Sequence, residues 1–96
     1  MELVGDAAQQ TRQVLINMGN ILEEANCGFE NVVKTTILMQ DISQLLAVNE
    51  VYAEFFNQNQ PARVAYQVAA LPRGALVEIE AIAELGEVTE VAEVEK

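Results

Sequence analysis

The chain has 96 residues, with 15 acidic and 5 basic side chains, no histidine and one cysteine. A chain of this length allows one domain, which buries a modest share of its surface and is often stabilised further by oligomerisation. The formal charge of −10 repels phosphate backbones, so we expect no nucleic-acid partner. Without histidine, Ser-His-Asp and Cys-His catalysis are excluded and the commonest metal ligand is missing.

The same sequence features also indicate the cellular compartment of the protein. Cys27 has no second cysteine to pair with, so an intrachain disulfide is impossible and a reducing environment is favoured. The sequence has no secretory leader pattern and no apolar run long enough to span a bilayer. We therefore expect a cytoplasmic protein without a membrane partner.

Two amphipathic helices are predicted. The first begins at Asp6, where Gln9 completes a capping-box pattern, and should end with Gly28 in a left-handed C-terminal position. The second begins at Asp41, with Gln44 three residues later, and ends before Pro61. The apolar stripes recur at helical spacing and comprise Ala8, Val14, Leu15, Met18, Leu22 and Ala25 in the first helix and Leu45, Val48, Tyr52 and Phe55 in the second.

Three strands are predicted around these helices. Residues 31–40 are rich in β-branched side chains and read as a central strand, and residues 60–83 read as two strands joined by a Pro72-Arg73-Gly74 turn. The strand, helix and strand between residues 32 and 68 should form a right-handed parallel crossover. Both helices then pack on one face of a mixed sheet, which gives an α+β fold.

The other face of that sheet is left bare. The later strands carry more apolar side chains than one covered face requires, namely Val64, Tyr66, Val68, Ile79 and Ala81. A second copy of the chain is the simplest cover, because most soluble oligomers are homo-oligomers. Residues 86–96 are acidic, with a valine at every third position, and we expect a mostly mobile tail or, alternatively, an added edge strand.

Four segments then occur in an order that resembles the Rid family of reactive intermediate deaminases, also called the YjgF family. They are Asn31-Val-Val-Lys-Thr-Thr36, Val48-Asn-Glu-Val-Tyr52, Pro61-Ala-Arg-Val-Ala-Tyr-Gln-Val-Ala-Ala-Leu-Pro72 and Val77-Glu-Ile-Glu-Ala-Ile-Ala83. The resemblance covers nearly the whole of a single Rid-like domain, residues 1–85. It implies a chorismate-mutase-like fold and a homotrimer with ligand clefts between subunits. Members ordinarily carry further strands before the first helix, with Gly-Pro-Tyr-Ser-Gln and Ser-Gly-Gln segments, so this fold is expected to be truncated at the N-terminus.

The resemblance also implies an activity, the hydrolysis of enamine and imine intermediates such as 2-aminoacrylate to 2-keto acids and ammonia, without cofactor or metal. Arg63 resembles the residue that clamps the substrate carboxylate, and Glu78 resembles the group that positions or activates water. Asn49 resembles a cleft-lining polar residue, and the backbone at Ala65 resembles a further polar contact. A planar guanidinium suits the first role because it donates two parallel hydrogen bonds.

Alternatives remain open at this point. From the residues alone, a solvent-facing position at the helix boundary is the favoured interpretation of Asn49, and strand parity cannot separate Glu78 from Glu80. In a plain hairpin turning near Arg73, Arg63 and Glu78 lie roughly 17 Å apart and cannot meet. Either the two strands are not hairpin partners, or the site draws on different subunits. The alternative function is a non-catalytic truncated or engineered relative that assembles and binds small carboxylates, and the endonuclease activity attributed to some relatives fits poorly with the charge.

Overall fold

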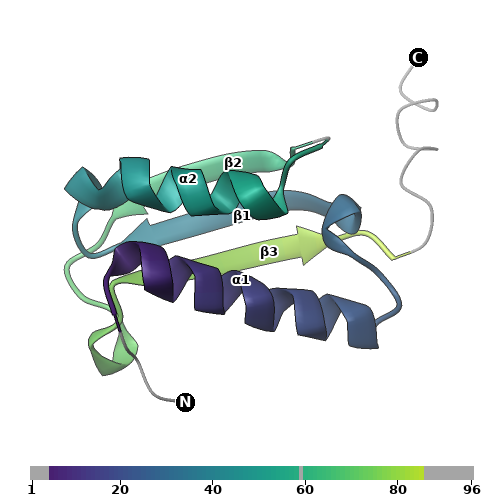
Figure 1. The fold of residues 1–96 in the computed structure, drawn as a ribbon, viewed down its shortest axis with the longest axis horizontal. Helices are drawn as coiled ribbons and strands as arrows, with labels where there is room; N and C mark the ends of the chain where they lie inside the picture. The colour runs from purple at the N-terminus through teal and green to yellow at the C-terminus, as the bar shows by residue number, and fades with distance from the viewer. Residues whose placement is uncertain (1–4, 59, 86–96) are drawn as a thin grey trace.

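The computed structural model describes residues 5–58 and 60–85. In that part of the chain two helices lie against one side of a three-stranded sheet (Figure 1). The elements are α1 (Ala7–Glu24), β1 (Val32–Met39), α2 (Leu45–Phe55), β2 (Ala62–Gln67) and β3 (Val77–Ala83), with short 3-10 turns at Phe29–Asn31, Ile42–Gln44 and Pro72–Gly74. The predicted α+β architecture is therefore confirmed. The predicted acidic tail, residues 86–96, lies outside the described residues.

The central strand is β1, as its apolar composition predicts, and the strand order is β2-β1-β3. β1 and β2 run parallel, which confirms the crossover through α2, whereas β1 and β3 run antiparallel. β2 and β3 are consecutive in the chain but lie on opposite sides of β1. The hairpin geometry considered from the sequence is therefore wrong, and the strands are not direct partners.

The predicted Pro-Arg-Gly turn lies in the connection between β2 and β3, but the two strands that it links are not paired with each other. Arg73 and Gly74 both adopt positive φ angles, 61° and 70°, inside a short 3-10 turn. Glycine tolerates this backbone at little cost, whereas the left-handed region is uncommon for arginine. The turn carries the chain from one edge of the sheet to the other, so it is a crossing and does not close a hairpin.

The prediction for the beginning of α1 is correct, and the prediction for its end is wrong. The capping box is present: the Asp6 carboxylate accepts from the Gln9 N–H at 2.9 Å, and the Gln9 side chain accepts from the Asp6 N–H at 3.0 Å. At the other end Asn26, with φ 62°, takes the left-handed position that was assigned to Gly28. Gly28 is extended, at φ −139°. Asparagine tolerates left-handed backbone, and the Cys27 N–H then donates to the Leu22 carbonyl in a Schellman-type closure.

The start of α2 also differs from the sequence pattern. Asp41 caps the 3-10 turn Ile42–Gln44 by accepting from the Ser43 N–H, and α2 itself begins at Leu45. Gln44 therefore precedes the α-helix and does not complete a capping box.

The core lies between the helices and the sheet. Its fully buried side chains include Leu15 of α1, Ile37 and Met39 of β1 and Val48 of α2. Ile79 is buried against the helices at 8% exposure, because it pairs with Ile37 and so shares its face. In the part of the chain that the structure describes, no helix is long and apolar enough to cross a membrane.

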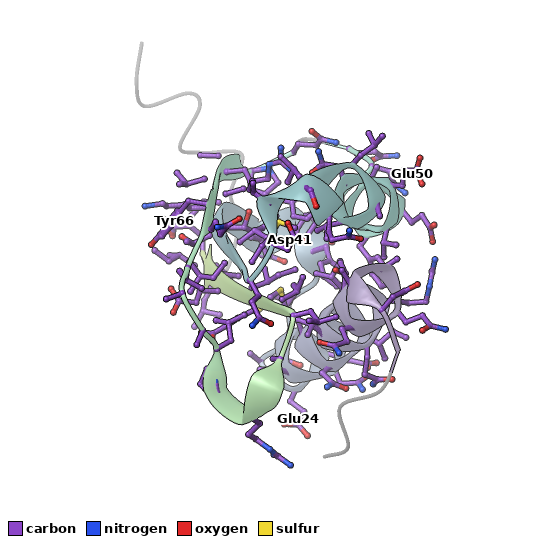
Figure 2. All side chains as sticks on the ribbon, turned by 90° about the vertical axis from the view of Figure 1, so that its left-hand side faces the viewer. Glu24, Asp41, Glu50 and Tyr66 are labelled. Atoms are coloured by element: carbon purple, nitrogen blue, oxygen red, sulfur yellow. The ribbon has the colours of Figure 1, made fainter. Side chains whose placement is uncertain are left out.

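The sheet face away from the helices is apolar and uncovered in the single chain. Val64 and Tyr66 of β2 and Ile82 of β3 are 47%, 49% and 60% exposed. Figure 2 shows Tyr66 on the side of the sheet opposite the two helices. The bare face inferred from the sequence is therefore present, although its membership differs.

Candidate functional site

A pocket of about 260 Å³ lies where α2 faces the beginning of β2. Its lining comes from the middle of α2 and from the segment that leads into β2, and comprises Asn49, Tyr52, Ala53, Gln60, Pro61 and Arg63. Two residues singled out from the sequence, Arg63 and Asn49, thus lie in the same pocket. They are 14 positions apart in the chain.

Arg63 is positioned by two side chains of α2. One guanidinium nitrogen donates a hydrogen bond to the Asn49 side-chain oxygen. The guanidinium carbon also lies 5.3 Å from the centre of the Tyr52 ring, which is within the range of a cation–π contact. An arginine has five N–H donors and Asn49 accepts from one, so donors remain for an incoming anion.

The local structure explains this placement. Arg63 pairs in register with Thr35, a fully buried residue of β1, so its side chain leaves the sheet on the helix side. Asn49 and Tyr52 are three residues apart and therefore lie on the same face of α2. The solvent-facing reading of Asn49 is therefore wrong, because its side chain reaches across to β2.

Ala65 lies two residues beyond Arg63 on the same strand face. It pairs with Ile37, is partly buried and packs against the core. Its side chain is not among those that line the Arg63 pocket.

Glu78 is not brought to Arg63 within one chain. It pairs with Leu38, one residue out of phase with the buried Ile37 and Met39, so it lies on the bare face of the sheet. Arg63 and Glu78 are two strands apart and three residues offset along β1, which places their Cα atoms about 14 Å apart. Their side chains leave opposite faces of the sheet. Glu80 shares the bare face, so neither glutamate contacts the pocket in a single copy.

Tyr52 is a pocket residue that the sequence reasoning did not identify as functional, because it belongs to the apolar stripe of α2. Its ring is buried at 4% exposure, and its hydroxyl shares a 2.7 Å hydrogen bond with the Thr35 hydroxyl. Phe56 stacks on the ring at a centroid distance of 4.5 Å. The sequence feature that could have identified Tyr52 as a site residue is its place one helical turn from the polar Asn49, because a buried tyrosine hydroxyl usually needs a hydrogen-bond partner.

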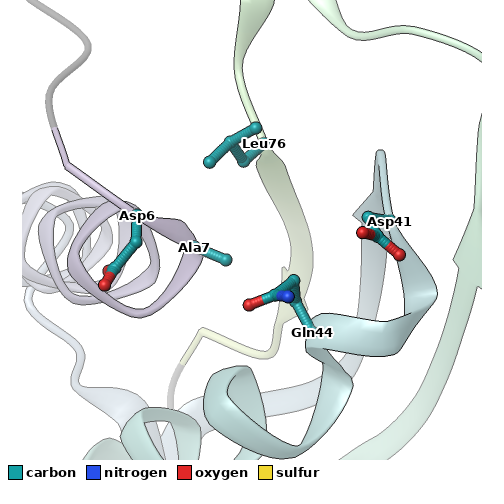
Figure 3. A pocket seen from close by; sticks show the side chains of 5 residues that line it. All are labelled: Asp6, Ala7, Asp41, Gln44 and Leu76. Atoms are coloured by element: carbon teal, nitrogen blue, oxygen red, sulfur yellow. The ribbon is translucent and has the colours of Figure 1, made fainter.

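A second pocket, of about 270 Å³, lies between the beginning of α1 and the 3-10 turn before α2 (Figure 3). Its two carboxylates already serve as caps, because Asp6 accepts from the Gln9 N–H and Asp41 from the Ser43 N–H and hydroxyl. The hydrogen bonds to Ser43 hold the pKa of the Asp41 carboxyl below its ordinary value. Within residues 5–58 and 60–85, no group of three or more His, Cys, Asp or Glu side chains is arranged to hold a metal ion.

The sequence model of the Endoribonuclease L-PSP family matches residues 1–85. The chain is 54% identical over 85 residues to the human protein named 2-iminobutanoate/2-iminopropanoate deaminase, a match that covers 88% of this chain and 62% of the relative. It is 49% identical over 79 residues to a RutC family protein of Pyrococcus horikoshii, covering 82% of this chain and 63% of that protein. The chain thus spans less than two thirds of the length of these curated relatives.

Solved structures agree with the fold. RidA from an Antarctic Psychrobacter superposes with a TM-score of 0.86 at 40% identity, covering 88% of this chain and 69% of that one. TdcF of E. coli, whose structure contains bound serine, superposes with a TM-score of 0.82 at 35% identity, again covering 88% of this chain and 69% of the other. Together with the family match over residues 1–85, these likenesses establish that the chain belongs to the Endoribonuclease L-PSP family, also known as the Rid or YjgF family.

Proposed function

We propose that this chain is an imine and enamine deaminase of the 2-iminobutanoate/2-iminopropanoate type, which hydrolyses intermediates such as 2-aminoacrylate to 2-keto acids and ammonia. The observation that carries the proposal is the Arg63 guanidinium at a pocket, where Asn49 is its one hydrogen-bond acceptor among the described residues. Relatives named for this activity are 54% identical to the chain, and a structural relative binds serine, a small carboxylate-bearing molecule.

In the proposed reaction, Arg63 binds the carboxylate of a 2-imino acid through paired hydrogen bonds, and Asn49 fixes the guanidinium. Glu78 takes a proton from a water molecule as the water oxygen bonds to the imine carbon. Glu78 passes this proton to the imine nitrogen as the carbon–nitrogen double bond becomes single, which gives a carbinolamine. The carbinolamine hydroxyl proton then moves to the nitrogen by way of Glu78, the hydroxyl oxygen forms the carbonyl double bond, and the remaining carbon–nitrogen bond breaks to release ammonia and the keto acid. The backbone at Ala65 supplies a further polar contact. These residues need no cofactor or metal, because imines already hydrolyse in water and the site only orients the reactants.

Glu78 must come from another copy of the chain for this site to be complete. In one copy Arg63 and Glu78 leave opposite faces of the sheet, and the bare face carries apolar side chains at Val64 and Tyr66. We therefore propose a homotrimer in which residues 1–85 act as one domain and each site draws on two subunits. A cytoplasmic location remains our expectation.

A binding-only role is the second candidate. The observation that favours it is the same separation of Arg63 from Glu78 in the single chain. In that case the protein assembles and binds small carboxylates through Arg63 without turnover.

The experiment is ammonia release from 2-aminoacrylate generated in situ, on protein whose mass in solution has been measured. We expect acceleration by the wild-type chain and a loss of about a hundredfold in Arg63→Ala, because a charge-assisted hydrogen-bonded pair is removed. Arg12→Ala is the matched control, since it removes an equal charge from an exposed ion pair with Glu54 outside the pocket. A wild-type rate equal to that without protein overturns the deaminase proposal. Loss of pyruvate binding in Arg63→Ala then supports the binding role.

A further inference from the structure

Tyr52, which contacts the Arg63 guanidinium, is itself held by residues behind the pocket lining. The Tyr52 ring lies against the guanidinium, its hydroxyl is tied to Thr35, and Phe56 stacks on the ring. Tyr52 is 4% exposed and Thr35 is fully buried. These contacts fix both the plane and the position of the ring before any ligand arrives.

A fixed aromatic ring is useful at this place because Arg63 itself is exposed. An exposed arginine side chain samples many rotamers, and ordering it on binding costs free energy. The electron-rich ring face attracts the guanidinium, and the Asn49 oxygen then sets its direction. Two neutral contacts hold the cation without neutralising it, whereas a carboxylate in either place competes with an anionic ligand.

We propose that Tyr52 is a positioning residue for carboxylate binding: it acts through Arg63 by holding the guanidinium over its ring, with the Thr35 hydroxyl locking that ring in place. The inference rests on the proposed role of Arg63 in binding carboxylates. It assigns to a residue of the apolar stripe a function separate from core packing. The hydroxyl orients the ring, and the ring face holds the Arg63 guanidinium.

The test uses the chain of residues 1–96 and pyruvate, a stable 2-keto acid, with dissociation constants measured by NMR titration. Tyr52→Leu removes the ring face and is expected to weaken pyruvate binding about two- to fivefold, as an exposed cation–π contact predicts. Tyr52→Phe keeps the ring face but loses the hydrogen bond to Thr35, so its affinity should lie between those of the wild type and Tyr52→Leu. Phe55→Leu is the matched control, because it removes a ring from the same helix that contacts Phe29 and does not line the Arg63 pocket.

Turnover gives a second readout. If Tyr52 acts by positioning Arg63, Tyr52→Leu raises KM for the imine by the same factor and leaves kcat nearly unchanged. A purely structural role lowers stability but does not change KM of the folded protein. Wild-type affinity in Tyr52→Leu together with lost affinity in Arg63→Ala overturns the inference and leaves the proposed function standing. Wild-type affinity in Arg63→Ala overturns both.

Should Tyr52→Leu fail to fold, the wild-type protein still decides the question. Ring-current shifts of the Arg63 side-chain protons, with nuclear Overhauser contacts to the Tyr52 ring, are expected in both the free and the pyruvate-bound protein. Arg63 side-chain signals at random-coil positions in both states overturn the inference.

Discussion

Arg63 of β2 donates a hydrogen bond to the side-chain oxygen of Asn49 on α2, which ties the edge strand to the helix at the mouth of the pocket. The contact joins two segments that the sequence separates by 14 positions. It holds a cation beside a neutral acceptor, an arrangement that leaves the charge available to a ligand.

Substitution of Asn49 tests this arrangement directly. Asn49→Ala is expected to weaken pyruvate binding about fivefold, because one hydrogen bond to the guanidinium is lost and water replaces it in part. Asn49→Asp should weaken binding further, since the new carboxylate pairs with Arg63 and competes with the ligand. Equal affinities for Asn49→Asp and the wild type, measured by NMR titration, contradict the assignment.

Replacing Glu78 and Glu80 by glutamine, one at a time, tests which of the two acts in catalysis. Glu78→Gln should lower kcat for imine hydrolysis by a factor on the order of 10² to 10⁴ while pyruvate binding is retained, because a general base is removed. Glu80→Gln is the matched control, with the same change on the same face of β3, and should keep most of the activity. Steady-state rates with equal losses in both variants argue against a specific role for Glu78.

A site shared between subunits can be detected by the recovery of activity in oligomers that mix two inactive variants. Arg63→Ala and Glu78→Gln chains, each inactive alone, are co-expressed with different tags and purified as mixed oligomers. In every mixed trimer one of the three sites combines an intact Arg63 with an intact Glu78, so about a third of the wild-type activity should return. Mixed oligomers without any recovered activity place Arg63 and Glu78 of each site in the same copy.

The bare sheet face predicts the response of the oligomer to a new charge. Tyr66→Glu puts a carboxylate on an exposed apolar face and should shift the protein to monomers, because burying an unpaired charge in an interface is costly. Leu46→Glu serves as the control, since Leu46 is 73% exposed on α2, away from that face. Light scattering gives the mass of each variant, and an unchanged mass for Tyr66→Glu means that this face is not the interface.

Acid should destabilise the protein in part through Asp41. Hydrogen bonds from the Ser43 hydroxyl and N–H hold the pKa of Asp41 in the folded state below its ordinary 3.8. A lowered folded-state pKa stabilises the protein above the unfolded-state value, and this stabilisation is lost as the pH falls through and below it. Asp41→Asn keeps a capping oxygen that does not titrate. The urea midpoint should therefore fall more in the wild type than in Asp41→Asn between about pH 5 and about pH 2.5.

Much of the fold was readable from short-range patterns. The capping box at Asp6, the amphipathic helices and the β-branched run of β1 follow from chemistry within a few residues of each element. The family motifs placed Arg63 and Asn49 in one candidate site, although residue type alone favoured a solvent-facing Asn49. The sequence predicts the wrong left-handed residue at the end of α1, because both Asn26 and Gly28 tolerate that backbone and only the Schellman-type hydrogen bonds distinguish them.

By itself, the sequence determined which segments are helices and strands, that one sheet face lacks a cover, and which charged residues lie within the strands. Only the tertiary structure decided how those residues are combined. β1 lies between β2 and β3, and its register sends Arg63 toward the helices and Glu78 toward the bare face. The physical reason is that strand pairing is non-local: a neighbouring strand sets the face on which each side chain lies, and a shift of one residue reverses it.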